Sequence, residues 1–191
     1  MTEAGTDTFP IFAGNTFIEP ARSIVARWKD HGRRDVSELI FGHAQQLGEE
    51  CARFILLDHS YQRVREVWIV FMPSSRSATV HRGFIPAEVV ARGVATGLNT
   101  AGLSAHIFSG VRVRGNKNDQ VGLSVMQRRR NVSGKFYVPH RLTQRFSKDT
   151  LVLFVDDVVT TASTLFEVRR QFHLGSGTLA AGLALFATPK S

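Results

Sequence analysis

The chain has almost no cysteine and no long run of apolar residues. Cys51 is the only cysteine among 191 residues, which excludes an internal disulfide and a zinc site built from paired thiols. No apolar stretch approaches the roughly 20 residues that a membrane-spanning helix needs, so we expect no transmembrane segment. The N-terminal sequence "MTEAGTDTFP" lacks the basic and apolar regions of a secretory signal. We therefore expect a cytoplasmic protein without a structural metal ion.

Two common nucleotide-binding signatures are also missing. There is no glycine fingerprint of a dinucleotide-binding fold, and the nearest approach to the phosphate loop of nucleotide hydrolases is "GVRVRGNKN", residues 110–118. Its lysine comes one position late, and no serine or threonine follows to hold a metal ion. The seven histidines are scattered without metal-ligand or acid–base spacing, which favours ordinary structural roles for them.

Positive charge, by contrast, is in excess. Lys and Arg total 24 against 16 Asp and Glu, and the formal net charge is +8. This balance suits a polyanionic ligand or a nucleic acid, although a solvated basic surface would have the same composition. The basic run "QRRRN", residues 127–131, fits a solvated helix face and a ligand contact equally well.

Hydrophobic periodicity predicts one α/β domain over residues 1–191. We expect a loose arm with at most one short strand over residues 1–18. Helices are predicted at residues 19–30, 35–57, 86–103 and about 161–173, and strands at residues 66–72, 105–113, 151–155 and 178–187. The predicted strands are apolar almost throughout, rather than at every second position. This pattern indicates a mostly parallel central sheet with helices on both faces.

One motif, "LVLFVDDVVTTAST" at residues 151–164, combines acids with small hydroxyl-bearing residues. Asp156 and Asp157 follow a predicted buried strand, at the end where such sheets bind ligands. Carboxylates accept hydrogen bonds from sugar hydroxyls and bind Mg²⁺, while a helix start offers free N–H groups to a phosphate. The residues that would surround this phosphate are Thr160, Thr161, Ala162, Ser163 and Thr164. A sugar phosphate would satisfy both halves of the motif. The alternative is that Asp157 or Thr160 caps a helix, which explains one residue and not the rest.

The same motif resembles the phosphoribosyl pyrophosphate signature of the type I phosphoribosyltransferases, and the chain looks like the ComF (competence protein F) subfamily within them. The resemblance extends from about residue 12 to residue 188. It rests on the blocks "RSIVARWKDHGRRDV", "VFMPSSR" and "HRGF", on spaced positions of "QVGLSVMQRRRNVSGKF", and on the acidic motif. It implies a type I phosphoribosyltransferase-like fold with a small hood region. The paired cysteines that form a zinc ribbon in many family members are missing here.

The resemblance also implies roles for individual residues. Asp156 and Asp157 would bind the ribose hydroxyls and Mg²⁺, and residues 160–164 would bind the 5-phosphate. The pyrophosphate loop would consist of Pro73, Ser74, Ser75 and Arg76, with Arg76 as a catalytic residue beside the two acids. Further candidates are Lys29 and Arg82 near the site, and Gln120, Arg128 and Asn131 in the flexible loop or hood.

The implied reaction transfers a phosphoribosyl group from phosphoribosyl pyrophosphate to an unknown acceptor, with Mg²⁺ as cofactor and pyrophosphate as product. The alternative is a protein without turnover that binds the sugar phosphate or single-stranded DNA, in keeping with the subfamily's association with DNA uptake. A homodimer is left open, and a purely structural role would leave the acidic motif unexplained.

Overall fold

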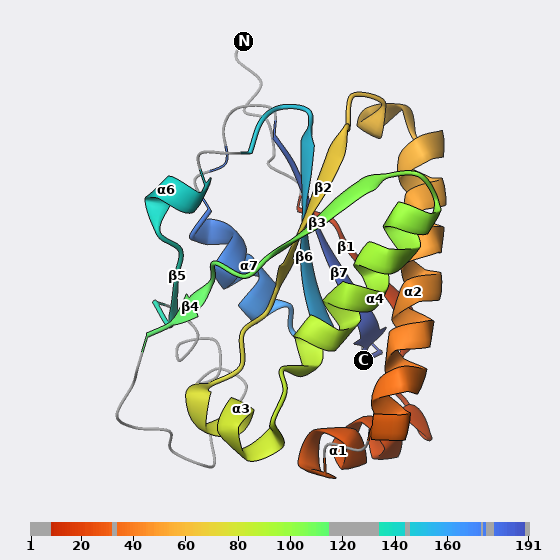
Figure 1. The fold of residues 1–191 in the computed structure, drawn as a ribbon, viewed down its shortest axis with the longest axis vertical. Helices are drawn as coiled ribbons and strands as arrows, with labels where there is room; N and C mark the ends of the chain where they lie inside the picture. The colour runs from red at the N-terminus through yellow and green to blue at the C-terminus, as the bar shows by residue number, and fades with distance from the viewer. Residues whose placement is uncertain are drawn as a thin grey trace.

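A parallel five-stranded sheet forms the centre of the molecule (Figure 1). The computed structural model describes residues 9–31, 34–114, 134–143, 146–172, 174 and 178–189. The sheet has the order β1-β7-β6-β2-β3, and every neighbouring pair of strands in it is parallel. Its strands are β1 (Ile11–Thr16), β2 (Glu66–Phe71), β3 (Ser104–Phe108), β6 (Thr150–Val159) and β7 (Leu179–Ala187). The predicted α/β class is therefore confirmed.

Strand β6 lies in the middle of this sheet and extends past its neighbour at the carboxyl end. Its first half, residues 151–155, is buried on both faces, which explains why the sequence there is apolar without alternation. It pairs with β2 as far as Val155 but with β7 as far as Val159. The acidic residues of the motif therefore lie on the part of β6 that β2 no longer covers.

Helices cover both faces of the sheet, and further short elements lie at its carboxyl end. Helices α2 and α4 pack on one face and α7 on the other, while α1 and α3 lie beyond the carboxyl ends of the strands (Figure 1). The helices are α1 (Ala21–His31), α2 (Arg34–Leu57), α3 (Arg76–Arg82), α4 (Pro86–Thr100), α6 (His140–Thr143) and α7 (Ser163–Arg170), with a 3-10 turn η1 (His59–Tyr61). In the part of the chain described, none of them is both long and apolar enough to cross a membrane.

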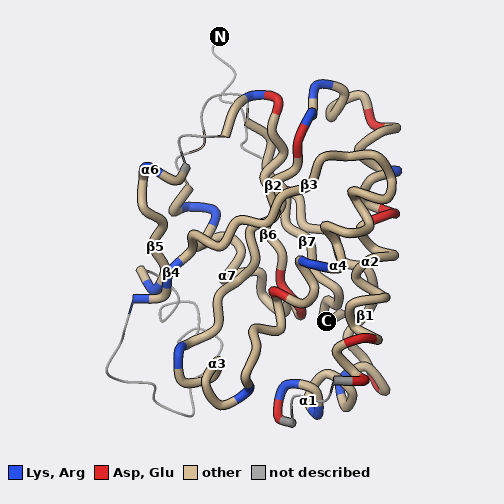
Figure 2. Tube along the Cα trace, in the orientation of Figure 1, with Lys and Arg blue, Asp and Glu red and all other residues tan. Residues whose placement is uncertain are grey.

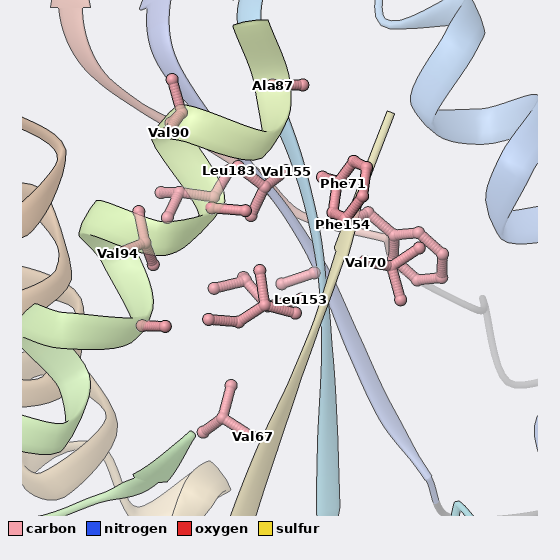
Figure 3. Close-up of a cluster of buried hydrophobic side chains, with 14 of the residues drawn as sticks. Val67, Val70, Phe71, Ala87, Val90, Val94, Leu153, Phe154, Val155 and Leu183 are labelled. Carbon is pink, nitrogen blue, oxygen red and sulfur yellow. The ribbon is translucent and has the colours of Figure 1, made fainter. Parts of the chain in front are cut away.

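The core between α4 and the sheet is built from branched aliphatic side chains. Val90 and Val94 of α4 lie against Leu153, Val155 and Leu183 of the central strands (Figure 3). All five are almost completely buried. This packing fixes α4 on the sheet, and with it the segment between β2 and α4 that lines the candidate site.

Two glycines let α4 approach α2 closely. A Cβ atom at Gly97 would lie 2.1 Å from the backbone oxygen of Gln45, and one at Gly48 would lie 2.4 Å from the backbone oxygen of Val94. Both distances are shorter than any real Cβ contact, so neither position can carry a larger residue without separating the helices.

Some elements differ from the sequence prediction. Residues 11–16, expected within a loose arm, form the edge strand β1, which pairs with β7; five of its six residues are exposed, so its sequence carries little apolar signal. The strand expected at 105–113 ends at Phe108, and the two-residue β4 (Arg112–Val113) pairs instead with β5 (Phe136–Tyr137) in a separate antiparallel ribbon. Helix α3 was not predicted, and the helix after the acidic motif is shorter than 161–173.

Candidate functional site

Two adjoining cavities lie at the carboxyl ends of the strands, around the acidic end of β6. Basic residues of α1, α3 and β4 lie around these acids (Figure 2). The smaller cavity has a volume of about 240 Å³ and is lined by both aspartates, Asp156 and Asp157. The other sequence-predicted residues that line it are Lys29, Pro73, Ser74, Ser75, Arg82 and Thr164. The fold thus brings together residues that are far apart in the sequence.

Asp157 faces α1 and forms an ion pair there. The Nζ atom of Lys29 lies 2.5 Å from Oδ2 of Asp157, and the two side chains are 28% and 10% exposed. Lys29 therefore serves as the counterion of this buried carboxylate oxygen, which accepts no further hydrogen bond from the described residues. A carboxylate has several acceptor positions, so Asp157 can still accept a hydrogen bond from a ligand hydroxyl or bind a cation.

The side chain of Asp156 points to the opposite side of the strand from that of Asp157. The pKa of Asp156 is shifted. Oδ1 of Asp156 accepts a hydrogen bond of 2.9 Å from the backbone N–H of Asp157. Burial, and secondly the neighbouring Asp157 carboxylate, raise the pKa of Asp156 well above its usual range, and Lys29 opposes this rise only weakly. Three cations, Lys29, Arg82 and Lys135, line the smaller cavity with these two carboxylates, and Lys29 pairs directly with Asp157.

This donor set suits Mg²⁺ bound together with a substrate. No group of three His, Cys, Asp or Glu side chains that could hold a metal ion occurs among the described residues. Mg²⁺ does not need such a group, because it keeps several waters and binds one or two carboxylates together with substrate phosphates. Asp156 and Asp157 supply two adjacent carboxylates at the cavity, which fits that mode of binding.

Between β6 and α7 the chain turns through a residue in the left-handed region. Ala162 has φ 56° and ψ 4°, a conformation that is uncommon for residues other than glycine. Helix α7 begins at the next residue, so the turn from strand to helix is completed within three residues. The turn is held in part by a contact of 2.9 Å between Oγ1 of Thr161 and Oγ of Ser163. The first N–H groups of α7, which the helix itself cannot use, are left available at this edge of the sheet.

The helix-cap explanation of the motif is wrong for this chain. The N-cap of α7 is Ala162, which has no side-chain oxygen, and no side chain makes the capping hydrogen bond. Asp157 pairs with Lys29 instead. Of the five residues expected around the 5-phosphate, Thr164 lines the smaller cavity, while Thr160 and Thr161 are exposed beside it.

The segment expected to bind pyrophosphate connects β2 to α3 and lies between the two cavities. Pro73, Ser74 and Ser75 line both of them. Ser75 is the N-cap of α3 and accepts a hydrogen bond of 3.3 Å from the N–H of Ala78. Arg76 lines only the larger cavity, of about 710 Å³. Lys29 and Arg82 line the smaller cavity together with the acids, whereas Arg76, the first candidate from the sequence, does not.

Three basic residues at the cavities were missed by the sequence analysis. Arg112 and Arg114 line the larger cavity, and Lys135, which directly precedes β5, lines both. No local pattern marks Lys135, because its position depends on the pairing of β5 with β4. The other hood candidates, Gln120, Arg128 and Asn131, lie outside the described residues.

Comparison with known proteins adds no assignment, because neither a protein-family model nor a curated protein matches this chain. What the site does has to be inferred from its own residues.

Proposed function

We propose that this protein is a type I phosphoribosyltransferase that acts in the cytoplasm. It would bind phosphoribosyl pyrophosphate with Mg²⁺ and transfer the phosphoribosyl group to an acceptor, with release of pyrophosphate. The observation that carries the proposal is the meeting of three parts in one cavity: the acidic pair of β6, the serines that follow β2, and three cations, Lys29, Arg82 and Lys135. A structural protein would have no need to place two carboxylates side by side in such a cavity.

Each part of the substrate has a chemically suitable partner. The ribose hydroxyls would donate to Asp156 and Asp157, and the 5-phosphate would lie at the N–H groups that begin α7, where the helix dipole favours an anion. The pyrophosphate would lie against Ser74, Ser75 and nearby cations of the cavity wall.

The chemistry needs positioning and electrostatics more than an acid or a base. The bond from the ribose C1 to the pyrophosphate oxygen breaks while the acceptor bonds to C1, and positive charge develops on the sugar ring. Holding the sugar at its hydroxyls and its 5-phosphate fixes C1 relative to both reacting groups. Lys29 and Arg82 would lower the energy of the departing pyrophosphate by neutralising its charge. Mg²⁺, held by Asp156 and Asp157, would supply further positive charge to the same oxygens.

Thermal unfolding with and without ligand tests this proposal. Phosphoribosyl pyrophosphate with Mg²⁺ at about 100 times the dissociation constant should add roughly 2.7 kcal/mol, which raises the midpoint by about 5–10 °C in a chain of this size. The shift should require Mg²⁺ and vanish in Asp156→Asn with Asp157→Asn. A control with Asp30→Asn and Asp149→Asn removes the same charge outside the cavities and should keep the shift. If the wild-type midpoint does not move at saturating ligand, the proposal fails.

The cations of the larger cavity favour one second candidate, a protein without turnover that binds single-stranded DNA. Arg76, Arg112, Arg114 and Lys135 all line that cavity. Such binding would weaken steeply with salt, because each neutralised phosphate releases counterions. Release of pyrophosphate with any acceptor would exclude this candidate as a complete account, and DNA binding without it would support the candidate.

A further inference from the structure

The larger cavity lies against the proposed sugar site and is big enough for a second molecule. Its volume is about 710 Å³, and it shares Ser74, Ser75 and Lys135 with the smaller cavity. A molecule bound in it would therefore lie next to the proposed sugar site.

The walls of this cavity carry uncompensated positive charge. Four cations line it, Arg76, Arg112, Arg114 and Lys135, against one carboxylate, Glu88. Glu88 is itself paired, since its Oε1 lies 2.6 Å from a guanidinium nitrogen of Arg92. No carboxylate of a described residue forms an ion pair with any of the four cations.

Contacts with uncharged groups orient the two arginines at β4, Arg112 and Arg114. Nη1 of Arg112 donates a hydrogen bond of 3.3 Å to the backbone oxygen of Ser109. The guanidinium carbon of Arg114 lies 5.7 Å from the ring centroid of Tyr137. Both contacts orient a guanidinium group without neutralising its charge, so both arginines can still bind an anion.

The buried carboxylate of Glu167 in α7 accepts a hydrogen bond from the segment that carries Lys135. The N–H of Gly134 donates a hydrogen bond of 2.7 Å to Oε1 of Glu167, whose residue is only 8% exposed. Glu167 also accepts hydrogen bonds from Arg170 and Gln171 of its own helix. The backbone N–H of Arg114 in turn donates to the oxygen of Lys135, at 2.7 Å. These hydrogen bonds fix the backbone at Arg114 and Lys135 before any ligand binds.

The rest of the described lining combines serines with apolar side chains and offers little for stacking. Ile85, Val111 and Val113 contribute aliphatic surface. The only aromatic ring among the described lining residues is that of Phe71, which is 8% exposed. An uncharged flat acceptor would gain apolar contact here but would leave the cations without a partner.

We propose that the acceptor carries an anionic group, a carboxylate or a phosphate, which binds to Arg112, Arg114 and Lys135. This inference rests on the proposed function. The nucleophilic nitrogen or oxygen of the acceptor forms the bond to C1, the pyrophosphate leaves with the electron pair of the C1–O bond, and the proton of the nucleophile goes to solvent. The anionic group takes no part in bond making and serves for binding and orientation.

The test compares matched probes that differ only in their charge. The pairs are nicotinate with nicotinamide, orotate with uracil, and phenyl phosphate with phenol, the last of which tests a phosphate in place of a carboxylate. Dissociation constants are measured by calorimetry for the full chain, alone and with phosphoribosyl pyrophosphate and Mg²⁺. The anionic member of at least one pair should bind about tenfold tighter or more than its neutral partner, as expected for a charge-assisted hydrogen bond.

Two double variants decide whether the cavity is responsible. Arg112→Gln with Arg114→Gln should abolish the preference for the anion, whereas Arg53→Gln with Arg65→Gln, which removes the same charge from exposed positions outside the cavity, should keep it. Equal binding of both members of every pair, or a preference that survives in the first variant, would overturn the inference. Binding of phosphoribosyl pyrophosphate is a separate readout. If phosphoribosyl pyrophosphate binds but the probes show no anion preference, only this inference fails. If the probes show the preference but phosphoribosyl pyrophosphate does not bind, the proposed function fails instead.

Discussion

Replacing Lys29 with methionine should destabilise the protein substantially, because it leaves the Asp157 carboxylate buried without a counterion. The side chain of Asp157 is 10% exposed, and Lys29 is the cation that lies against it. Breaking a buried ion pair by removing one partner costs about 3–5 kcal/mol. The side chain of Lys29 is itself 28% exposed, and the cavity gives the carboxylate some access to water, so the loss should be smaller. We expect about 2–3 kcal/mol, which lowers the thermal midpoint by about 5–10 °C in a protein of this size.

The Asp157→Asn variant should behave differently, because the lysine it leaves unpaired can turn toward solvent. Its loss should stay below about 1 kcal/mol, the range of exposed ion pairs. In the Lys29→Met, Asp157→Asn double variant no charge is left buried, so stability should recover to within about 1 kcal/mol of the wild type. The coupling energy between the two positions should therefore reach about 1–4 kcal/mol.

Urea unfolding measures all four members of this cycle. Trp28, next to Lys29 in the sequence and fully buried, provides a fluorescence signal from the same region, and circular dichroism checks that both probes give one transition. If Lys29→Met keeps wild-type stability, or if the losses of the two single variants simply add, the buried ion pair is not what holds α1 at the site.

Three further predictions concern the site and its support. Burial and Asp157 raise the pKa of Asp156, so the native protein binds the carboxyl proton more tightly than the unfolded chain does. The contribution of Asp156 to stability therefore falls as pH rises from the ordinary pKa of an aspartate through the raised pKa. Asp156→Asn should therefore gain stability relative to wild type in urea titrations as pH rises above the ordinary range of an aspartate carboxyl, because only the wild type loses this contribution; a constant difference would contradict the raised pKa. Ala162→Gly should raise stability by up to about 1 kcal/mol, because φ 56° suits glycine, whereas Ala162→Val should lower it by more than about 1 kcal/mol; thermal midpoints in the opposite order would refute the strained turn. Gly97→Ala should cost about 3 kcal/mol or more in denaturant unfolding, since its Cβ would lie 2.1 Å from the backbone oxygen of Gln45. The same change at the exposed Gly42, with nothing within 4 Å, should instead stabilise helix α2 by roughly 0.5–1 kcal/mol.

The sequence was informative where local pattern and burial agree. Strand β6 and its acidic end could be predicted, because a run of apolar residues that is buried on both faces leaves no alternation to misread. Helix α2 followed from its regular apolar spacing, and its observed bounds, Arg34–Leu57, differ from the prediction by one residue. The end of a strand in a parallel sheet is also where ligands bind, so the position of Asp156 and Asp157 could be predicted together with the strand.

The remaining parts depend on long-range pairing that no local pattern encodes. Strand β1 is held by β7, whose residues come about 170 positions later in the chain; Ile11 pairs with Gly182. Lys135 reaches both cavities only because β5 pairs with β4 and because Glu167 holds Gly134. For the same reason the sequence could not rank the cations: whether Arg76 or Arg82 faces the acids depends on the turn of α3, which is too short to leave a clear periodicity.

The unfavourable features of the molecule are concentrated at one place, and this argues for a ligand there. Asp156 and Asp157 are adjacent, Asp157 is buried and paired with Lys29, and Ala162 adopts a left-handed conformation a few residues later. Each of these features lowers the stability of the ligand-free protein. In addition, no side chain caps the start of α7. A ligand that brings hydroxyls or a cation to the carboxylates, and an anion to the start of α7, would relieve all of them together. A sugar phosphate bound with Mg²⁺ has these groups in that order, and this is why we expect ligand binding and the acidic pair to be inseparable in the unfolding experiments.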